Sequence, residues 1–271
     1  MKKIGVGLIG AGTVGQGVIE ILKNSPSLIA ERSGIFPELR MICDKNPDVA
    51  KEYKDIYTDN YETLINDPNI EIVVELVGGT KIAFDVVKYA LEKGKTVVTA
   101  NKALLSEKGK ELFELAGNKG VEIGYEAAVA GTIPILRSIK TGLIANSFNS
   151  VYGILNGTTN FILTKMEEEN SSYESVLKIA QELGFAEKDP TFDVEGIDAA
   201  HKVSILASLA LNQSLSLSDI FVEGITRVSK TEIQLAKELG YRIKLLGILK
   251  KKGDKLEARV NPTMVPIDHP I

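Results

Sequence analysis

Short apolar runs alternate with helical patterns along the first half of the chain. Alternation of this kind is typical of strand–helix–strand units and predicts a parallel sheet covered by helices. The expected strands are residues 3–9, 39–43, 72–75, 96–99 and 121–125, and the expected helices are residues 16–22, 82–93 and 106–119.

The pattern changes near residue 133. A helix over 133–142, with Pro134 in its first turn, is expected to link two domains, 1–132 and 133–271. A strand at 148–155 follows, then a helix over 161–168 with Thr158 as its N-cap. Further helices are expected at 173–183, 197–211 and 231–239, and strands at 243–250 and 256–265 should form a hairpin. The predicted fold is α/β: an N-terminal Rossmann-type parallel-sheet domain followed by an α+β domain with a mixed sheet.

A glycine-rich turn joins the first strand to the first helix. Its sequence is Gly10-Ala11-Gly12-Thr13-Val14-Gly15. In the dinucleotide fingerprint the first glycine permits a tight turn, the second lets a pyrophosphate approach the backbone, and the third allows close helix packing. Free N–H groups at the helix start then face the phosphates. The turn therefore predicts a dinucleotide site, with a purely structural turn as the alternative.

Asp44 ends the second expected strand. An acidic residue there accepts hydrogen bonds from the ribose hydroxyls and favours NAD. Its spacing from the glycine turn is longer than usual, and the adjacent Lys45 could serve the 2′-phosphate of NADP. Asp44 could also be a solvated turn residue. NAD and NADP both remain open, with a preference for NAD.

The expected helix over 197–211 sets two charged side chains on an apolar face. Asp198 and Lys202 share a stripe with Ile205 and Leu209, while small residues lie roughly opposite. A solvated pair at this spacing should head a polar stripe instead. One interpretation is a surface ion pair; the other places both charges at the mouth of a cleft, where a carboxylate orients a lysine.

Two more strand ends carry candidate residues. Lys102 follows the strand at 96–99 and should project beyond its carboxyl end, towards substrate or nicotinamide; a capping or solubilising role is the alternative. The strand at 148–155 ends in Asn156-Gly157-Thr158, a second junction whose backbone N–H groups could hold a substrate carboxylate.

Composition narrows the class of protein. With 271 residues and 44% hydrophobic content, the chain is long enough for about two domains. Its net charge of −4 has no basic block, and its apolar runs are strand-length or interrupted, so neither nucleic acid nor membrane is an expected partner. One cysteine, Cys43, and no leader before the first strand make the cytoplasm the expected location.

Five motifs together resemble those of the homoserine dehydrogenases, along the whole chain. They are GLIGAGTVGQGV at 7–18, VVTANKALL at 97–105, YEAAVAGTIPI at 125–135, ILNGTTNFIL at 154–163 and GFAEKDPTFDVEGIDAAHK at 184–202. The last two are specific to that family. The resemblance implies NAD(P)-dependent interconversion of aspartate 4-semialdehyde and L-homoserine, on the route to threonine, methionine and isoleucine. It also implies a homodimer formed through the sheet of the second domain.

The resemblance implies roles for individual residues. Lys202 matches the catalytic lysine, Asp198 its acidic partner, and Lys102 the lysine beside cofactor and substrate. Glu187 and Asp193 match carboxylates that bind the substrate amino group, with Gly157 and Thr158 near its other end. A monovalent cation, expected to be sodium, maps onto Glu126 and the carbonyls of Val129, Gly131 and Ile133; all-oxygen ligation suits such a hard cation.

One departure from the family concerns the C-terminus. Family members usually continue past the pair that matches His269-Pro270, with a segment that returns to the nucleotide domain. Without that continuation we expect the nucleotide domain to lack a covering element and to bind the cofactor less tightly, and we expect no feedback regulation by threonine through an appended domain.

Three alternative functions fit parts of the sequence. A phosphorylating semialdehyde dehydrogenase needs a cysteine nucleophile, and Cys43 lies in the nucleotide half. A non-catalytic dinucleotide sensor or scaffold has no reason to set Asp198 and Lys202 on an apolar stripe. A structural module would bind no cofactor.

Overall fold

The computed structural model describes residues 1–271 and contains two compact units, Met1–Ile133 and Pro134–Ile271. None of its helices combines the length and the apolar character that crossing a bilayer requires.

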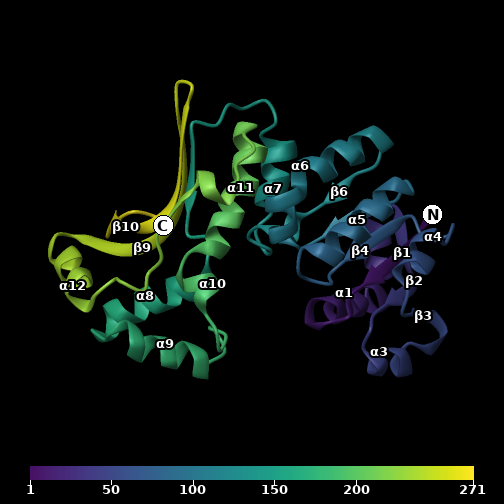
Figure 1. Ribbon diagram of the computed structural model, residues 1–271, viewed down its shortest axis with the longest axis horizontal. Coiled ribbons are helices and arrows are strands. Elements are labelled where there is room, and N and C mark those ends of the chain that lie inside the picture. Colours follow the sequence, from purple (N-terminus) through teal and green to yellow (C-terminus); the bar gives the residue numbers. More distant parts are fainter. The chain divides into compact units, whose positions relative to one another are not determined.

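Six parallel strands form the sheet of the N-terminal unit, in the order β3-β2-β1-β4-β5-β6 (Figure 1). The strands are β1 (Lys2–Ile9), β2 (Ile35–Cys43), β3 (Tyr57–Thr58), β4 (Ile72–Glu75), β5 (Thr96–Thr99) and β6 (Ile123–Gly124). The strand order reverses at β1, which pairs with β2 on one side and β4 on the other. Ligands of open parallel sheets bind beyond the carboxyl ends of the strands at such a point. The turn after β1 therefore occupies the binding position of this fold.

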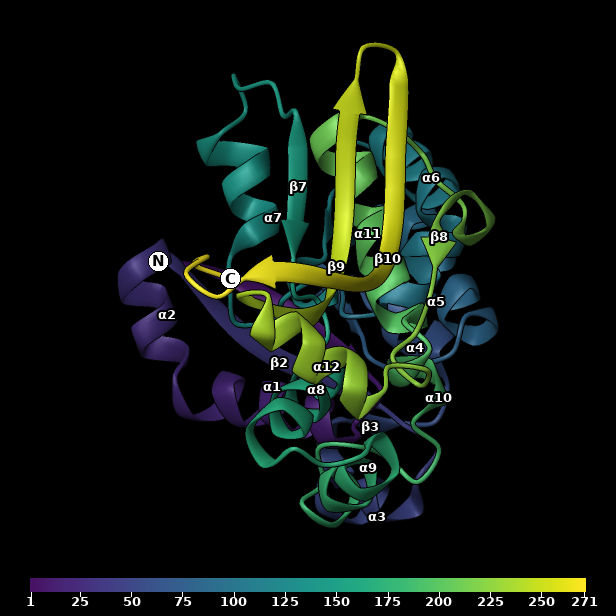
Figure 2. The ribbon, with the colours of Figure 1, turned by 90° about the vertical axis from the view of Figure 1, so that its left-hand side faces the viewer.

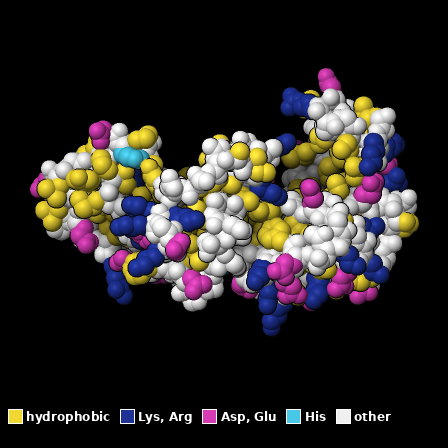
Figure 3. All heavy atoms as spheres, turned by 90° about the horizontal axis from the view of Figure 1, so that it is seen from above, with side chains coloured by type: hydrophobic (Ala, Val, Ile, Leu, Met, Phe, Trp, Pro, Cys, Tyr) yellow, Lys and Arg dark blue, Asp and Glu magenta, His cyan; other side chains and the backbone are white.

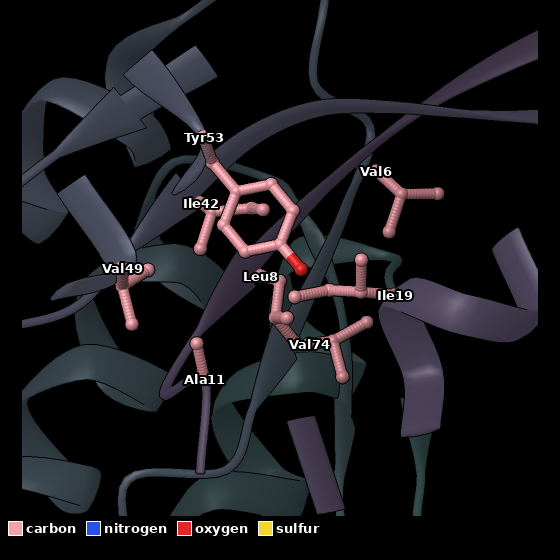
Figure 4. Packing of buried hydrophobic residues seen from close by; sticks show 8 residues of the cluster. All are labelled: Val6, Leu8, Ala11, Ile19, Ile42, Val49, Tyr53 and Val74. Carbon is pink, nitrogen blue, oxygen red and sulfur yellow. The ribbon is translucent and has the colours of Figure 1, made fainter. Parts of the chain in front are cut away.

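Helices cover both faces of this sheet. They are α1 (Thr13–Asn24), α2 (Pro26–Ser33), α3 (Pro47–Glu52), α4 (Tyr61–Asn66), α5 (Lys81–Glu92) and α6 (Lys102–Lys119). Alternate residues of β1 face opposite sides: Leu8 packs with Ile19 of α1, whereas Gly7 lies against Leu64 of α4. Figure 4 shows the cluster on the α1 side, where the ring of Tyr53 lies among aliphatic side chains.

Four strands form the sheet of the C-terminal unit, in the order β7-β9-β10-β8. They are β7 (Ser150–Gly153), β8 (Phe221–Val222), β9 (Tyr241–Lys252) and β10 (Lys255–Pro266). Figure 2 shows the long β9–β10 hairpin with β7 beside it. The β7–β9 and β9–β10 pairs are antiparallel and the β10–β8 pair is parallel, so this sheet is mixed.

Helix α11 (Ile197–Leu211) packs against one face of the mixed sheet. The remaining helices of the unit are α7 (Ile135–Arg137), α8 (Gly157–Glu169), α9 (Tyr173–Glu182), α10 (Thr191–Val194) and α12 (Lys230–Glu238). Gly247 of β9 permits the close contact with α11, because a Cβ there would lie 2.7 Å from Val203. On the opposite face, Leu246, Ile248 and Val265 form a smaller apolar cluster. Most residues of α11 are buried, which fixes the position of this helix and of its charged residues.

The predicted fold class is confirmed, and several local predictions are corrected. Helix α11 and strands β4 and β5 have the predicted bounds. The N-cap of α8 is Asn156 and not Thr158, since the Asn156 side chain accepts a hydrogen bond from Thr159 N. The predicted linking helix over 133–142 is α-helical only in α7 and is followed by a π-helical turn over Ser138–Gly142. Pro134 precedes α7 as its N-cap and does not lie in its first turn. Strand β7 is shorter than predicted. Elements α2, α3, α4, α10, β3 and β8 were not predicted.

On the face drawn in Figure 3, Lys and Arg side chains are interspersed with those of Asp and Glu. That distribution agrees with the small net charge of −4.

Candidate functional site

The glycine turn after β1 is built by close backbone contacts. Gly10 has a φ of +97°, and a Cβ there would lie 2.6 Å from the backbone of Leu76. A Cβ on Gly15 would lie 2.1 Å from Gly10 O, so α1 could not approach β1 with any larger residue there. Gly12 is different, because nothing lies within 4 Å of the place its Cβ would take. The turn therefore leaves open space at the one glycine that a ligand has to approach.

The start of α1 is exposed and has no side-chain cap. Gly12 holds the N-cap position, and Thr13 and Val14 of the first turn are exposed. A 12-residue helix carries a partial positive charge at this end, and its first N–H groups have no partner within the helix. These features suit an anionic group such as a pyrophosphate.

A cavity of about 820 Å³ opens beside this turn, within the N-terminal unit. Its wall includes Gly10 and Gly12 of the turn, Leu76 and Val77 after β4, and Ile82 and Val86 of α5, together with Ile9, Cys43, Asp44, Lys45, Asp59, Asn60 and Tyr61. The volume is within the range of small-molecule and cofactor sites.

The Asp44 carboxylate is fixed against the glycine turn. Its Oδ2 accepts a hydrogen bond from Ala11 N at 2.6 Å, and its Oδ1 accepts one from Asn46 N at 2.8 Å. A direct hydrogen bond therefore joins Asp44 to the glycine turn, although the two are far apart in the sequence. Each carboxylate oxygen keeps a second lone pair, which leaves Asp44 able to accept from a ribose hydroxyl.

Lys102 is the first residue of α6 and lies in a rigid frame of hydrogen bonds. The preceding Asn101 caps α6 by accepting from Leu104 N at 3.1 Å, and its amide donates to Gly79 O at 2.7 Å. Asn101 N in turn donates to the Thr99 hydroxyl, which donates to the buried Glu75 carboxylate at 2.7 Å. The loops after β4 and β5 are therefore tied together, and the tie fixes the backbone from which Lys102 projects.

The partly buried Lys202 forms an ion pair with the buried Asp198 in the C-terminal unit. Lys202 Nζ lies 2.7 Å from Asp198 Oδ2, with side chains only 16% and 4% exposed. The ammonium also donates to Leu155 O at 2.5 Å. This arrangement rules out the solvated surface pair. The small-residue stripe on the opposite side of α11 is buried as well, apart from Ser208.

Asn156 joins three parts of the unit at this point. Its amide nitrogen donates to Asp198 Oδ2 at 2.9 Å and to Asp193 Oδ1 at 2.7 Å, while its oxygen caps α8. The Thr158 hydroxyl lies 3.1 Å from Asp193 Oδ2 and 2.8 Å from Phe185 O. Four of the residues singled out from the sequence, Lys202, Asp198, Asp193 and Thr158, are therefore connected through contacts of one buried asparagine.

The other two substrate-site candidates are exposed. Gly157 opens α8 directly after Asn156. Glu187 lies in the loop after α9, where Gln181 Nε2 donates to its carbonyl at 3.1 Å. This bond places the backbone of Glu187 and leaves its carboxylate at the surface.

The candidate cation ligands lie in the turn that ends the N-terminal unit. Glu126 begins a short 3₁₀ helix, Glu126–Ala128, and Ala130 takes a left-handed conformation with a φ of +51°. No group of three or more His, Cys, Asp and Glu side chains that could hold a metal ion comes together in the chain. A cation here would therefore depend on backbone carbonyls beside one carboxylate, a donor set that suits a hard monovalent ion.

Two residues of these sites were missed from the sequence. Asn156 lies in the motif ILNGTTNFIL, and an Asn directly before Gly-Thr-Thr is a stronger N-cap signal than Thr158. Asp59 follows β3 and lines the cavity. Because β3 has only two residues, it produces no alternation of apolar and polar residues that would predict a strand.

Comparison with known proteins covers both units. A family model described as homoserine dehydrogenase matches residues 134–271, and one described as homoserine dehydrogenase, NAD binding domain, matches residues 10–126. Among curated relatives, homoserine dehydrogenase of Neisseria gonorrhoeae is 45% identical over 98% of this chain and 62% of its own length. That of Bacillus subtilis is 43% identical over 100% of this chain and 63% of its own.

Solved structures of homoserine dehydrogenases are also similar to this chain. A homoserine dehydrogenase from Thiobacillus denitrificans matches with a TM-score of 0.95 and 44% identity, over 100% of this chain and 63% of that one. A putative homoserine dehydrogenase from Archaeoglobus fulgidus matches with a TM-score of 0.88 and 35% identity, over 98% and 85%. The chain thus spans 62–63% of the two curated relatives and a larger share of the archaeal protein.

Proposed function

Because this chain belongs to the homoserine dehydrogenase family, we propose that it catalyses the NAD(P)-dependent interconversion of aspartate 4-semialdehyde and L-homoserine. The observation that carries the proposal is the buried Lys202–Asp198 pair on α11, held by Asn156. A non-catalytic dinucleotide-binding protein has no need for a lysine and a carboxylate at a place where desolvation is costly. We also propose that the enzyme is cytoplasmic and acts in the biosynthesis of threonine, methionine and isoleucine.

Lys202 is the proposed proton donor. Reduction of an aldehyde develops negative charge on its oxygen, which needs a positioned donor. An ammonium has three N–H donors, and Asp198 and Leu155 O take two of them. The third is left for the substrate oxygen. Asp198 fixes the direction of the lysine, and Lys102 is the proposed helper.

Asp193 and Glu187 are proposed to bind the substrate ammonium group, because two carboxylates complement one cation. Asp193 is oriented by Asn156 and Thr158, whereas the exposed Glu187 is placed to meet an incoming ligand. Gly157 and Thr158, at the start of α8, are proposed to hold the substrate carboxylate on their backbone N–H groups.

The nicotinamide cofactor is proposed to bind in the cavity beside the glycine turn, and when bound it supplies hydride to the carbonyl carbon. Gly10, Gly12, Thr13, Val14 and Gly15 would hold its pyrophosphate, and Asp44 its ribose. Lys102 is proposed to contact the cofactor as well. An additional monovalent cation, sodium by expectation, is proposed at Glu126 and the carbonyls of Val129, Gly131 and Ile133. It would stabilise that turn and take no part in the redox step.

A homodimer formed through the mixed sheet completes the proposal. Two exposed aromatic side chains, Tyr152 and Phe221, lie in register on the same face of this sheet and support an apolar contact there. Sedimentation velocity of the purified chain tests this point, and a monomer at micromolar concentration would count against it.

The test of function is an absorbance assay of nicotinamide oxidation with aspartate 4-semialdehyde, run beside a titration of each reduced cofactor. We expect turnover with at least one cofactor. Binding without turnover would favour the non-catalytic sensor, and absence of binding would favour a structural module.

A further inference from the structure

A second carboxylate lies next to Asp44 at the edge of the nucleotide cavity. Strands β2 and β3 pair in parallel with Cys43 opposite Thr58, so the next residues along the two strands, Asp44 and Asp59, leave the sheet side by side. The backbone supports this register, since Asp44 N donates to Thr58 O at 3.3 Å. Both acids line the cavity of about 820 Å³.

The local charge of this part of the cavity is negative. Its wall contains three charged residues, Asp44, Asp59 and Lys45. The neighbouring Cys43 responds to all three: burial, then Asp44 and Asp59, together raise the pKa of its thiol to about 11, and Lys45 acts in the opposite direction. The single lysine therefore does not compensate two acids.

Neighbouring hydrogen bonds keep this wall in place. Asp44 is held by Ala11 N and Asn46 N, as described above. The backbone after β3 is held as well, because Asn60 N donates to the Thr58 hydroxyl at 3.2 Å and the Asn60 side chain caps α4. Asp59 lies between these fixed points, so its charge stays at the cavity edge.

Resting on the proposed function, we propose that Asp59 acts with Asp44 as a specificity-determining residue that selects NAD(H) over NADP(H). The 2′-phosphate of NADP(H) carries nearly two negative charges at neutral pH and would meet two carboxylates and one lysine. The unmodified ribose of NAD(H) offers hydroxyl groups, which donate hydrogen bonds to carboxylates. Discrimination thus comes from repulsion of the wrong cofactor as much as from contacts to the right one.

Direct binding tests this proposal without requiring turnover. NADH and NADPH are each titrated by nicotinamide fluorescence into the unaltered chain, Asp59→Asn and the control Asp55→Asn. Asp55 is an exposed acid four positions earlier that does not line the cavity. Both substitutions remove one negative charge and keep the shape of the side chain.

We expect the unaltered chain to bind NADH about tenfold or more tightly than NADPH, since two carboxylates oppose one phosphate. Asp59→Asn should strengthen NADPH binding about fivefold and change NADH binding less than twofold, a modest effect because the side chain is exposed and screened. Asp55→Asn should leave both affinities unchanged. Raising the salt concentration should narrow the preference of the unaltered chain.

Equal or tighter NADPH binding by the unaltered chain would overturn the selectivity, and an unchanged ratio in Asp59→Asn would overturn the role of Asp59. Either result leaves the dehydrogenase proposal standing if turnover is observed. Selective binding of NADH without turnover would support the selectivity and count against the dehydrogenase proposal. If neither cofactor binds, both proposals are rejected.

Discussion

The amide of Asn156 donates a hydrogen bond to Asp198 Oδ2 over 2.9 Å, at the same carboxylate oxygen that accepts the Lys202 ammonium. One oxygen thus receives two donors from different elements, the loop before α8 and helix α11 itself. Since Asn156 is buried and also caps α8, the direction of Lys202 depends on the position of that loop. The proposed proton donor and the proposed substrate-binding loop are coupled through this residue.

Asn156→Ser separates the two roles of this asparagine. Serine keeps an oxygen able to cap α8 but has no amide to donate to Asp193 and Asp198. We expect kcat to fall about tenfold or more, because displaced catalytic groups lose orientation. Asn156→Ala, which also loses the cap, should cost about 1–2 kcal/mol more stability in urea. Normal turnover in the serine variant would show that the amide positions nothing.

Lys202→Ala should lower kcat by about two orders of magnitude or more, as loss of a general acid does. It also leaves Asp198 buried without its cation, and breaking a buried pair costs about 3–5 kcal/mol. The double variant Lys202→Met/Asp198→Asn removes both charges and serves as the folding control. It should melt closer to the unaltered chain and remain inactive. Substantial kcat in either variant would remove the assigned mechanism.

Glu187→Ala should act on substrate binding alone. The side chain is exposed, so its loss should leave stability unchanged, while one carboxylate fewer around the ammonium should raise KM about tenfold. Steady-state kinetics with aspartate 4-semialdehyde measure this, with kcat expected within about twofold of the original. Glu182→Ala, an exposed acid at the end of α9, is the control. An unaltered KM in Glu187→Ala would take this residue out of the site.

How much could be predicted from the sequence depends on the range of the interactions. Helix α11 was predicted with correct bounds because Gly196 precedes it and its apolar pattern is uninterrupted. The glycine turn was recognised because its requirements are local. By contrast, the hydrogen bonds from Asn156 to Asp193 and Asp198 join residues 37 and 42 positions apart. Contacts at such separations cannot be predicted from the periodicity of the sequence.

Short elements could not be predicted from the sequence for a related reason. Strand β3 has two residues, fewer than one full alternation, so neither the strand nor the position of Asp59 after it could be predicted. Asn156 is the stronger N-cap of the two by propensity, and its oxygen caps α8 while its amide nitrogen donates to the neighbouring acids.

Glu75→Ala should destabilise the N-terminal unit strongly. The carboxylate is fully buried, accepts from Val77 N at 2.8 Å and from the Thr99 hydroxyl, and thereby joins the loops after β4 and β5. Its removal leaves the buried Thr99 hydroxyl without its acceptor, takes the partner from Val77 N and opens a cavity, at a cost of about 2–4 kcal/mol. Glu71→Ala, an exposed acid just before β4, should change the free energy of unfolding by less than about 0.5 kcal/mol. Equal urea midpoints for the two variants would contradict the role of Glu75.

Cys43 gives a prediction about alkaline pH. Burial, then Asp44 and Asp59, raise the pKa of its thiol from near 9 to about 11, so between these values the unfolded chain loses a proton that the folded chain keeps. The stabilisation is therefore complete below pH 9 and is lost as the pH rises through about 11, by roughly 2–3 kcal/mol in all. Urea unfolding from pH 8 to 11 measures the slope. The variant Cys43→Ala keeps every tyrosine, so the difference in slope between the two proteins reports the thiol together with its smaller effect on the pKa of Tyr57. Parallel curves would mean that Cys43 ionises at its ordinary pKa in the folded protein.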